Sequence, residues 1–177
     1  MRALTEITAR SSAAPKFYGL HAGRVTDVQD PDKLGRIKVS VPSVFGAESA
    51  DLQTWARPCF PAGHFFVPDV DDRVWVAFEH GDPSAPVWLG EWYATANTPP
   101  EASASPPARR AIRTASGHRI LLDDTAGSEQ VVVEDAAGSR ITLSADGLIL
   151  HAGGDLTIEA PGRTIVLKAA SVDVQGA

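Results

Sequence analysis

The sequence predicts an all-β protein whose two halves follow different plans. Every aromatic residue lies between residues 17 and 93, and all but one of the 13 prolines lie at or before Pro107. The last third of the chain instead carries short apolar triplets separated by turns rich in Gly, Asp and Ser. Neither half shows a convincing helical period. Short strands joined by turns are therefore expected in both halves.

Composition narrows the classes of function. The 177 residues suffice for one domain with an appendage or for two small domains. A net charge of −6 argues against a nucleic-acid or anionic-membrane surface. The single cysteine, Cys59, excludes an internal disulfide framework, and its apolar neighbours predict a buried side chain rather than a nucleophile. No run approaches the roughly 18 apolar residues of a membrane span. Residues 1–16 are small and polar, which predicts a flexible tail that is not a secretory signal.

Residues 17–93 predict a compact β-barrel. Apolar and polar residues alternate at 36–41 and 74–78, as in half-buried strands, and Asp30-Pro31-Asp32 and Gly81-Asp82-Pro83 are turn signals. The predicted strands cover residues 18–27, 35–41, 53–57, 73–78 and 86–90. Five short strands with long, Pro-containing connections favour a Greek-key barrel of the OB type, and a different small barrel would fit almost as well.

An OB barrel raises the possibility of nucleic-acid binding. Residues 17–93 carry six basic and eleven acidic residues, a net charge of −5. Such a domain lacks the basic surface that phosphate binding requires. The aromatic side chains are therefore predicted to form the core and a subunit interface rather than a platform for base stacking, and no nucleic-acid partner is expected.

Residues 94–110 are predicted to be a linker, because two Pro-Pro pairs make this stretch extended and semi-stiff. Residues 111–177 hold seven apolar triplets, and in each triplet the two outer residues share one face of a strand. The predicted apolar positions are Ile120, Leu122, Val131, Val133, Ile141, Leu143, Leu148, Leu150, Leu156, Ile158, Ile165, Leu167, Val172 and Val174.

Strands of this length cannot hide an apolar face or satisfy their edges alone. A meander would leave one apolar face uncovered, and a single-chain solenoid would have too few coils to be stable. Three identical chains wound together, each giving one strand in turn to each of three faces, would bury every triplet on a common axis. The predicted fold is thus an N-terminal OB-fold β-barrel followed by a C-terminal intertwined trimeric β-helix, or prism.

Candidate chemical sites have simpler structural interpretations. Asp123-Asp124 could be a paired-carboxylate site, but a strand-end turn with one Asp bonded to a backbone amide is favoured. Residues 79–82 (Glu-His-Gly-Asp) could offer metal ligands, but no second cluster lies at ligand spacing, which favours a solvated turn. Glu48 could act as a lone acid, although an exposed loop is favoured. No catalytic, cofactor-binding or metal site is predicted.

Several motifs follow one another in a fixed order along the chain. They are Phe17-Tyr18-Gly19-Leu20, Val25-Thr26-Asp27, Asp30-Pro31-Asp32-Lys33-Leu34-Gly35-Arg36-Ile37-Lys38-Val39, Trp55-Ala56-Arg57, Phe66-Val67-Pro68-Asp69-Val70, Val74-Trp75-Val76-Ala77-Phe78-Glu79-His80-Gly81-Asp82-Pro83, Pro86-Val87-Trp88-Leu89-Gly90 and Thr114-Ala115-Ser116-Gly117-His118-Arg119-Ile120 with Asp123-Asp124. This ordered set resembles the central-spike, or baseplate-assembly, proteins of contractile injection systems, which include contractile phage tails, type VI secretion spikes and extracellular phage-tail-like particles. Asp71-Asp72 stands where that family commonly has Gly-Asp, and no lysozyme-like domain lies between barrel and rod.

The resemblance implies a structural spike. Three barrels would sit on the trimeric baseplate hub, and the twined rods would form a needle that sheath contraction drives through a target envelope. The implied partners are two further copies of the chain, the hub and other baseplate components, with only transient contact with the target membrane and no cofactor. The implied location is the cytoplasm during assembly and then a phage-tail-like particle.

The end of the needle carries its own expectation. The C-terminal residues lack a His-x-His metal pair, so the resemblance implies a separate PAAR-type tip protein. The predicted tip interface comprises Asp173, Gln175, Gly176 and Ala177. Two alternatives remain, an envelope polysaccharide-degrading enzyme with a trimeric stalk and a ligand-binding OB module with a β-rich appendage.

Overall fold

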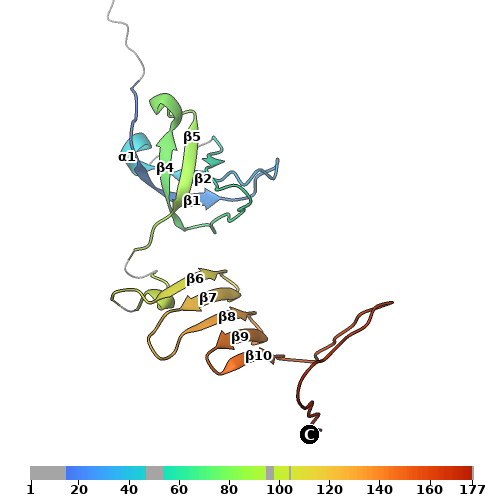
Figure 1. The fold of residues 1–177 in the computed structure, drawn as a ribbon. Coiled ribbons are helices and arrows are strands. Elements are labelled where there is room, and N and C mark those ends of the chain that lie inside the picture. The colour runs from blue at the N-terminus through green and yellow to red at the C-terminus, as the bar shows by residue number, and fades with distance from the viewer. Residues whose placement is uncertain (1–14, 47–53, 95–97, 104, 177) are drawn as a thin grey trace, which may run out of the picture. The chain divides into compact units, whose positions relative to one another are not determined.

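The computed structural model describes residues 15–46, 54–94, 98–103 and 105–176. The chain divides into two compact units, Met1–Thr98 and Pro99–Ala177. The first contains β1 (His21–Asp27), β2 (Lys38–Ser40), α1 (Pro42–Phe45), β3 (Arg57–Pro58), β4 (Arg73–Phe78), η1 (Glu79–Gly81) and β5 (Pro86–Glu91). The second contains η3 (Pro100–Ser103), β6 (Arg109–Arg113), β7 (Arg119–Asp123), β8 (Gln130–Glu134), β9 (Arg140–Ser144) and β10 (Gly147–His151) (Figure 1). The prediction of an all-β protein is confirmed.

The first unit is a closed barrel. Its strand order is β2-β1-β4-β5-β3, and a bridge between Ile37 and Ala56 joins the two ends of that order. All ladders are antiparallel except β3 with β5, which is parallel. A three-strand meander whose third strand pairs in parallel with the fifth is the Greek-key arrangement of the OB fold. The predicted strand at residues 53–57 is reduced to the Ala56 bridge and β3, and Gln53 lies outside the described residues.

Alternating apolar residues of the barrel strands fill its interior. The core residues are Val25, Ile37, Val39, Val41, Ala56, Val74, Val76, Phe78 and Trp88. Trp88 packs edge-on against Phe60 with ring centroids 5.0 Å apart. Cys59, by contrast, is exposed, so the prediction that it is buried is wrong for a single chain. The apolar neighbours misled the prediction because Cys59 lies on the outward phase of the alternation, two residues after the exposed Arg57, while its N–H still donates to the Trp88 carbonyl (2.9 Å).

Asp30 organises the turn that precedes β2. Its carboxylate accepts hydrogen bonds from the backbone N–H of Leu34 (2.7 Å) and of Arg36 (3.2 Å), and from the Arg36 guanidinium (3.0 Å). The side chain is only 4% exposed, and the Arg36 guanidinium holds the pKa of Asp30 well below its usual value. The turn also brings the Gly35 carbonyl within 3.2 Å of the Trp88 indole nitrogen, which donates to it. This motif therefore has a structural role in the barrel.

Asp71 occupies a backbone conformation that favours glycine. Its φ is 79°, inside the left-handed region, and its exposed carboxylate pairs with Arg24 at 2.6 Å. The turn is held by a bond from the Asp71 N–H to the Val25 carbonyl (3.0 Å). The strained position explains why the motif of the resembling family commonly has Gly here.

The second unit is a five-stranded antiparallel meander in the order β10-β9-β8-β7-β6. Each strand pairs with the next along the same chain. The expectation that consecutive strands go to different faces of a prism is therefore wrong for residues 109–151. Tight turns explain the difference: at residues 135–139, for example, Asp135 Oδ1 accepts the N–H groups of Ala137 and Ser139, which folds β9 directly back onto β8.

Residues 152–176 behave differently. None of them belongs to a strand within the chain, and beyond the one-turn bond from the Arg163 N–H to the Ala160 carbonyl (2.9 Å) their backbone forms no ladder. Figure 1 shows this segment running on from the end of β10 and away from the sheet. The last three apolar triplets thus lack a strand partner in a single chain.

Candidate functional site

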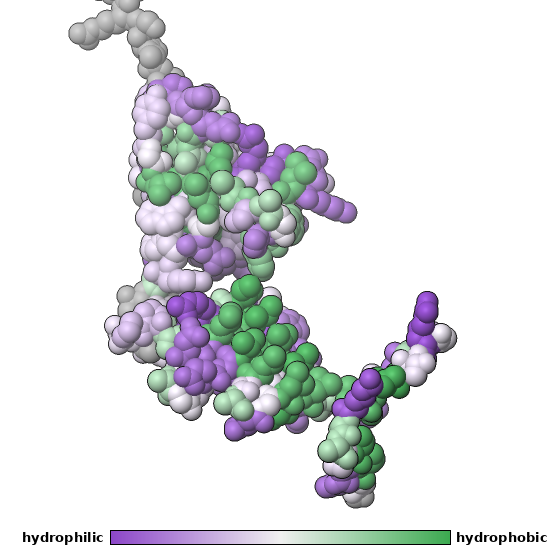
Figure 2. All heavy atoms as spheres, viewed as in Figure 1, coloured by the Kyte–Doolittle hydropathy of each residue, from purple (hydrophilic) through white to green (hydrophobic). Residues whose placement is uncertain are grey.

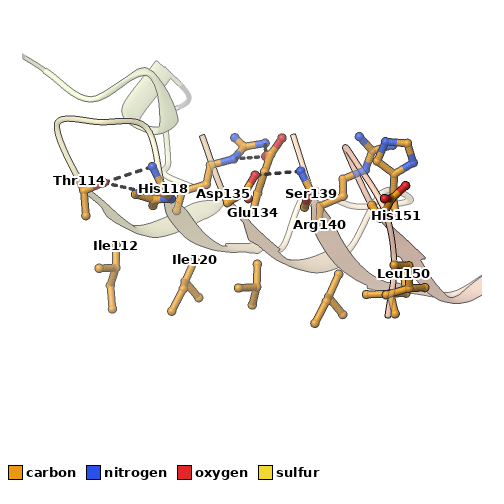
Figure 3. A pocket seen from close by; sticks show the side chains of 16 residues that line it. Ile112, Thr114, His118, Ile120, Glu134, Asp135, Ser139, Arg140, Leu150 and His151 are labelled. Carbon is orange, nitrogen blue, oxygen red and sulfur yellow. Dashed lines mark hydrogen bonds and ion pairs between the residues drawn. The ribbon is translucent and has the colours of Figure 1, made fainter. Parts of the chain in front are cut away.

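The meander of the second unit has one apolar face, built from two cross-strand rows. One row contains Ile112, Ile120, Val133, Ile141 and Leu150, and the other contains Leu122, Val131, Leu143 and Leu148. These residues are register partners on successive strands, and because side chains alternate along a strand they all project from the same side of the sheet. Figure 3 shows Ile112, Ile120 and Leu150 pointing the same way from three different strands. We call this surface the apolar face.

The apolar face is uncovered in a single chain. Exposure of its side chains ranges from 38% for Val131 to 68% for Leu148. Figure 2 shows the corresponding continuous hydrophobic surface over the second unit. Soluble monomers rarely leave a contiguous apolar face of this kind in water. Burial of this face by another surface would stabilise the strands, because in a single chain only their other face is packed.

On the opposite face of the same sheet, the apolar side chains of β7 and β8 are buried within the chain. Leu121 and Val132, the central residues of β7 and β8, are 6% and 5% exposed. Charged pairs flank them: Arg109 donates to Asp123 (2.8 Å), and Arg119 donates to Glu134 (2.7 Å). The nearby Glu101 carboxylate, which comes from η3, is also nearly buried and accepts a bond from Arg113 (3.0 Å). The ion pairs make this second face suited to contact with water, whereas the exposed apolar face is suited to contact with another protein surface.

A hollow of about 610 Å³ runs along the apolar face. Its floor is the Ile112 row, and one bank is formed by polar residues at the strand ends, including Thr114, His118 and Ser139 (Figure 3). Their polar atoms have local backbone partners, such as the Ala136 N–H that donates to His118 Nδ1 (3.2 Å). The hollow therefore has an apolar base, and the polar residues along its side already have hydrogen-bond partners within the chain. Such a hollow is suited to bind apolar side chains of another chain.

Asp123 and Asp124 do not form a carboxylate pair. Asp123 Oδ1 accepts the backbone N–H of Thr125 (3.0 Å), and Asp124 pairs with Arg110. The Thr125 hydroxyl and amide, followed by the Arg109 guanidinium, hold the pKa of Asp123 below its usual value. The favoured interpretation as a strand-end turn is confirmed.

The other candidate chemical sites also have structural partners. Glu79 pairs with Arg57, and Asp82 Oδ1 accepts the backbone N–H of Ser84 (2.9 Å), so residues 79–82 form a solvated turn. Within the described residues no group of three or more His, Cys, Asp or Glu could hold a metal ion. Glu48 lies outside the described residues. In the part of the chain that the structure describes, no helix has the length and hydropathy of a membrane span.

The structure brings together the predicted axis residues from Ile120 to Leu150 on the apolar face. Those from Leu156 to Val174 are exposed and belong to no strand, and of these residues only Leu156 lines the hollow on the apolar face. The sequence prediction missed Ile112, because one apolar residue between arginines on β6 shows no triplet. At the predicted tip, Gln175 donates to Asp173 (2.9 Å), and Ala177 lies outside the described residues.

Comparison with known proteins matches both units. Residues 21–93 match the family described as type VI secretion system/phage-baseplate injector OB domain, and residues 110–177 match the phage baseplate V C-terminal trimerisation domain. The chain is 28% identical over 137 residues to the protein named type VI secretion system spike protein VgrG3 from Vibrio cholerae serotype O1. That alignment covers 69% of this chain but only 14% of the Vibrio protein, so the chain spans a small part of that relative.

The two matched domains occur here in the same order as the barrel and the meander, and the second match is to a trimerisation domain. A trimerisation domain accounts for a sheet that is saturated on one face and uncovered on the other. The chain therefore belongs to the phage-baseplate V family of baseplate spike proteins, with an injector OB domain followed by a C-terminal trimerisation domain.

Proposed function

We propose that three copies of this chain form the central spike of a contractile injection system baseplate, which caps the tube hub and punctures the target envelope when the sheath contracts. The observation that carries the proposal is the apolar face of the second unit, exposed in one chain and built from register partners on five strands. Three such faces turned toward a common axis bury one another and leave the three polar faces in water.

The three-sided arrangement would make the spike stiff. Each sheet is held by antiparallel ladders within its own chain, so the prism consists of three pre-formed plates rather than of flexible strands. Cross-strand ion pairs such as Arg119 with Glu134 brace the outer surface. A rigid, closed body of this kind transmits a compressive push along its axis, which is the mechanical task of a puncturing device.

The barrels would mount the spike on the trimeric hub, and the C-terminal residues Asp173, Gln175, Gly176 and Ala177 would meet a separate PAAR-type tip protein. The exposed, unpaired state of residues 173–176 in the single chain is compatible with a contact made only in the assembly. We place the protein in the cytoplasm during assembly and afterwards in the phage-tail-like particle, with only transient contact with the target membrane.

We further propose that the chain is not an enzyme. The candidate carboxylates Asp123 and Asp124 each form an ion pair with an arginine, so the two do not form a free acid–base pair. Purified protein should leave peptidoglycan intact in a zymogram. Clearing that disappears on the substitution Asp123→Asn or Glu48→Gln would establish the polysaccharide-degrading alternative instead.

Electron microscopy of particles from the source organism tests the proposed function. Deletion of the gene should give particles, or baseplates, without density for the central spike, and complementation with the wild-type gene should restore that density. A tagged copy of the chain should label the end of the particle that meets the target. Spike density that persists in the deletion strain, or label found away from the baseplate, would contradict the proposal.

A further inference from the structure

The chain leaves its own sheet at Gly153, through a contact that only glycine allows. The Gly153 N–H donates to the Ser139 hydroxyl oxygen (3.1 Å), and a Cβ added at Gly153 would lie 2.8 Å from the Ala137 carbonyl oxygen. The φ of Gly153 lies outside the left-handed region, so glycine is required here for close approach and not for its backbone angles. Gly154, the next residue, has nothing within 4 Å of an added Cβ.

This contact lets the chain continue in the direction of β10 beyond the end of the sheet. Ser139 and Ala137 belong to the turn between β8 and β9, so the backbone at Gly153 lies against the end of the neighbouring hairpin. The connections between earlier strands fold back on themselves, whereas the segment after β10 continues away from the sheet (Figure 1). A return of the chain onto its own β10 would require Gly153 to leave both Ser139 and Ala137.

Two segments that lack a strand partner then lie close together in the sequence. β10 is the last strand of its sheet, and among the residues that the structure describes none pairs with its outer edge. Leu156 and Ile158, which follow Gly153, are exposed at 55% and 64% and belong to no strand. They also keep the even-numbered phase of Leu148 and Leu150, so an extended chain would present them on the same side as the apolar face.

We propose that the contact between Gly153 and Ser139 is the crossover at which each chain passes to a neighbouring copy, and that residues 155–159 pair with the outer edge of β10 in that copy. The inference rests on the trimer of the proposed function and places the start of strand exchange at residue 153. Residues 109–151 form their strands within one chain, and residues 155–159 gain their strand partner only from another copy. Threefold rotation preserves the direction in which each chain circles the axis, so the incoming segment runs parallel to the neighbour's β10.

The exchange has a consequence for assembly. Three separate sheets can meet and part through their apolar faces, but chains that have exchanged strands cannot separate without breaking backbone ladders. The segment after Gly153 therefore makes the trimer dissociate much more slowly than three sheets that meet only through their apolar faces. Substitution of Gly153 should weaken the pairing of residues 155–159 with the neighbouring copy, while the sheets themselves remain folded.

Hydrogen–deuterium exchange of the full-length protein, with the oligomer mass measured on the same sample, tests this inference. In the wild-type trimer, amides of residues 155–159 should be protected although a single chain gives them no partner. Gly153→Ala should make these amides exchange about tenfold faster or more, because the added Cβ meets a carbonyl oxygen. Gly154→Ala is the matched control and should exchange as the wild type does.

Amides of β7 and β8 report in the same experiment whether the sheet is folded, and they should stay protected in both variants. A wild-type trimer whose residues 155–159 exchange freely would overturn the crossover but leave the proposed spike intact. Equal protection of these residues in Gly153→Ala and Gly154→Ala, with β7 and β8 protected, would overturn it as well. A monomeric wild-type chain would contradict the proposed function and the crossover together.

Discussion

Val133 and Ile141 are register partners on β8 and β9, and both side chains are exposed on the same face of the sheet, whereas Leu121 and Val132 on the other face are buried. Their neighbours in the row repeat this arrangement on every strand from β6 to β10. The pair shows on a small scale what the second unit lacks: β6 to β10 form their ladders within one chain, but the apolar side chains on this face are not buried.

A charge placed on the apolar face should break the trimer. Leu150→Asp would bring three carboxylates together near the axis, where desolvation and repulsion oppose association. Ile149→Asp is the matched control, because Ile149 is an equally exposed apolar residue of the same strand that projects from the opposite face. Light scattering should give a monomer mass for Leu150→Asp and a trimer mass for Ile149→Asp.

The barrel should survive in both of these variants. Every tryptophan lies between residues 17 and 93, so tryptophan fluorescence reports the barrel alone. Its urea unfolding midpoint should be the same in Leu150→Asp as in the wild type to within experimental error. A barrel that unfolds together with the trimer would show that the first unit depends on the second for its stability.

Asp30 should make the stability of the barrel sensitive to acid. Its pKa is lower in the folded chain than in the unfolded chain, so it contributes stability that is fully present above the unfolded value, near pH 4, and is lost as the pH falls below that value. Asp30→Asn should lower the thermal midpoint of the barrel at pH 7. The difference from the wild type should narrow below about pH 4. A difference that stays constant from pH 7 to pH 3 would assign the effect to packing rather than to charge.

Asp71 should be replaceable by glycine with a gain in stability. Relief of the positive φ should contribute about 1 kcal/mol, against a smaller loss from the exposed ion pair with Arg24. Asp71→Ala should instead lower the free energy of unfolding, because alanine keeps the strain and loses the ion pair. Arg24→Ala isolates the ion pair, and urea titration followed by tryptophan fluorescence measures all three. Equal stability of the Gly and Ala variants would contradict the strain argument.

Much of this architecture follows from local sequence. The alternation in β4 and the turn signals at Asp30 and Asp82 predict the barrel strands because each residue acts on its immediate neighbours. The apolar triplets predict the apolar face for the same reason, since period-two patterns report which side chains share a side of a strand. These local signals predict the all-β fold, which the structure confirms, and the matches to both domains confirm the family.

The pairing of the strands could not be read from the same pattern. A triplet such as Ile141-Thr142-Leu143 looks the same whether its partner strand comes from its own chain or from another. The deciding features are the turns, where Asp135 binds the amides that fold β9 back, and the close approach at Gly153, which the sequence shows only as one glycine among many. Ile112 was missed for a related reason: only its register with Ile120 places it on the apolar face.

The mass of the full-length protein in dilute solution tests the central claim most directly. Light scattering coupled to size-exclusion chromatography should give three times the 18.7 kDa of one chain, unchanged on dilution through the micromolar range. A mass of one chain under the same conditions would leave the apolar face without its partner and would contradict the spike.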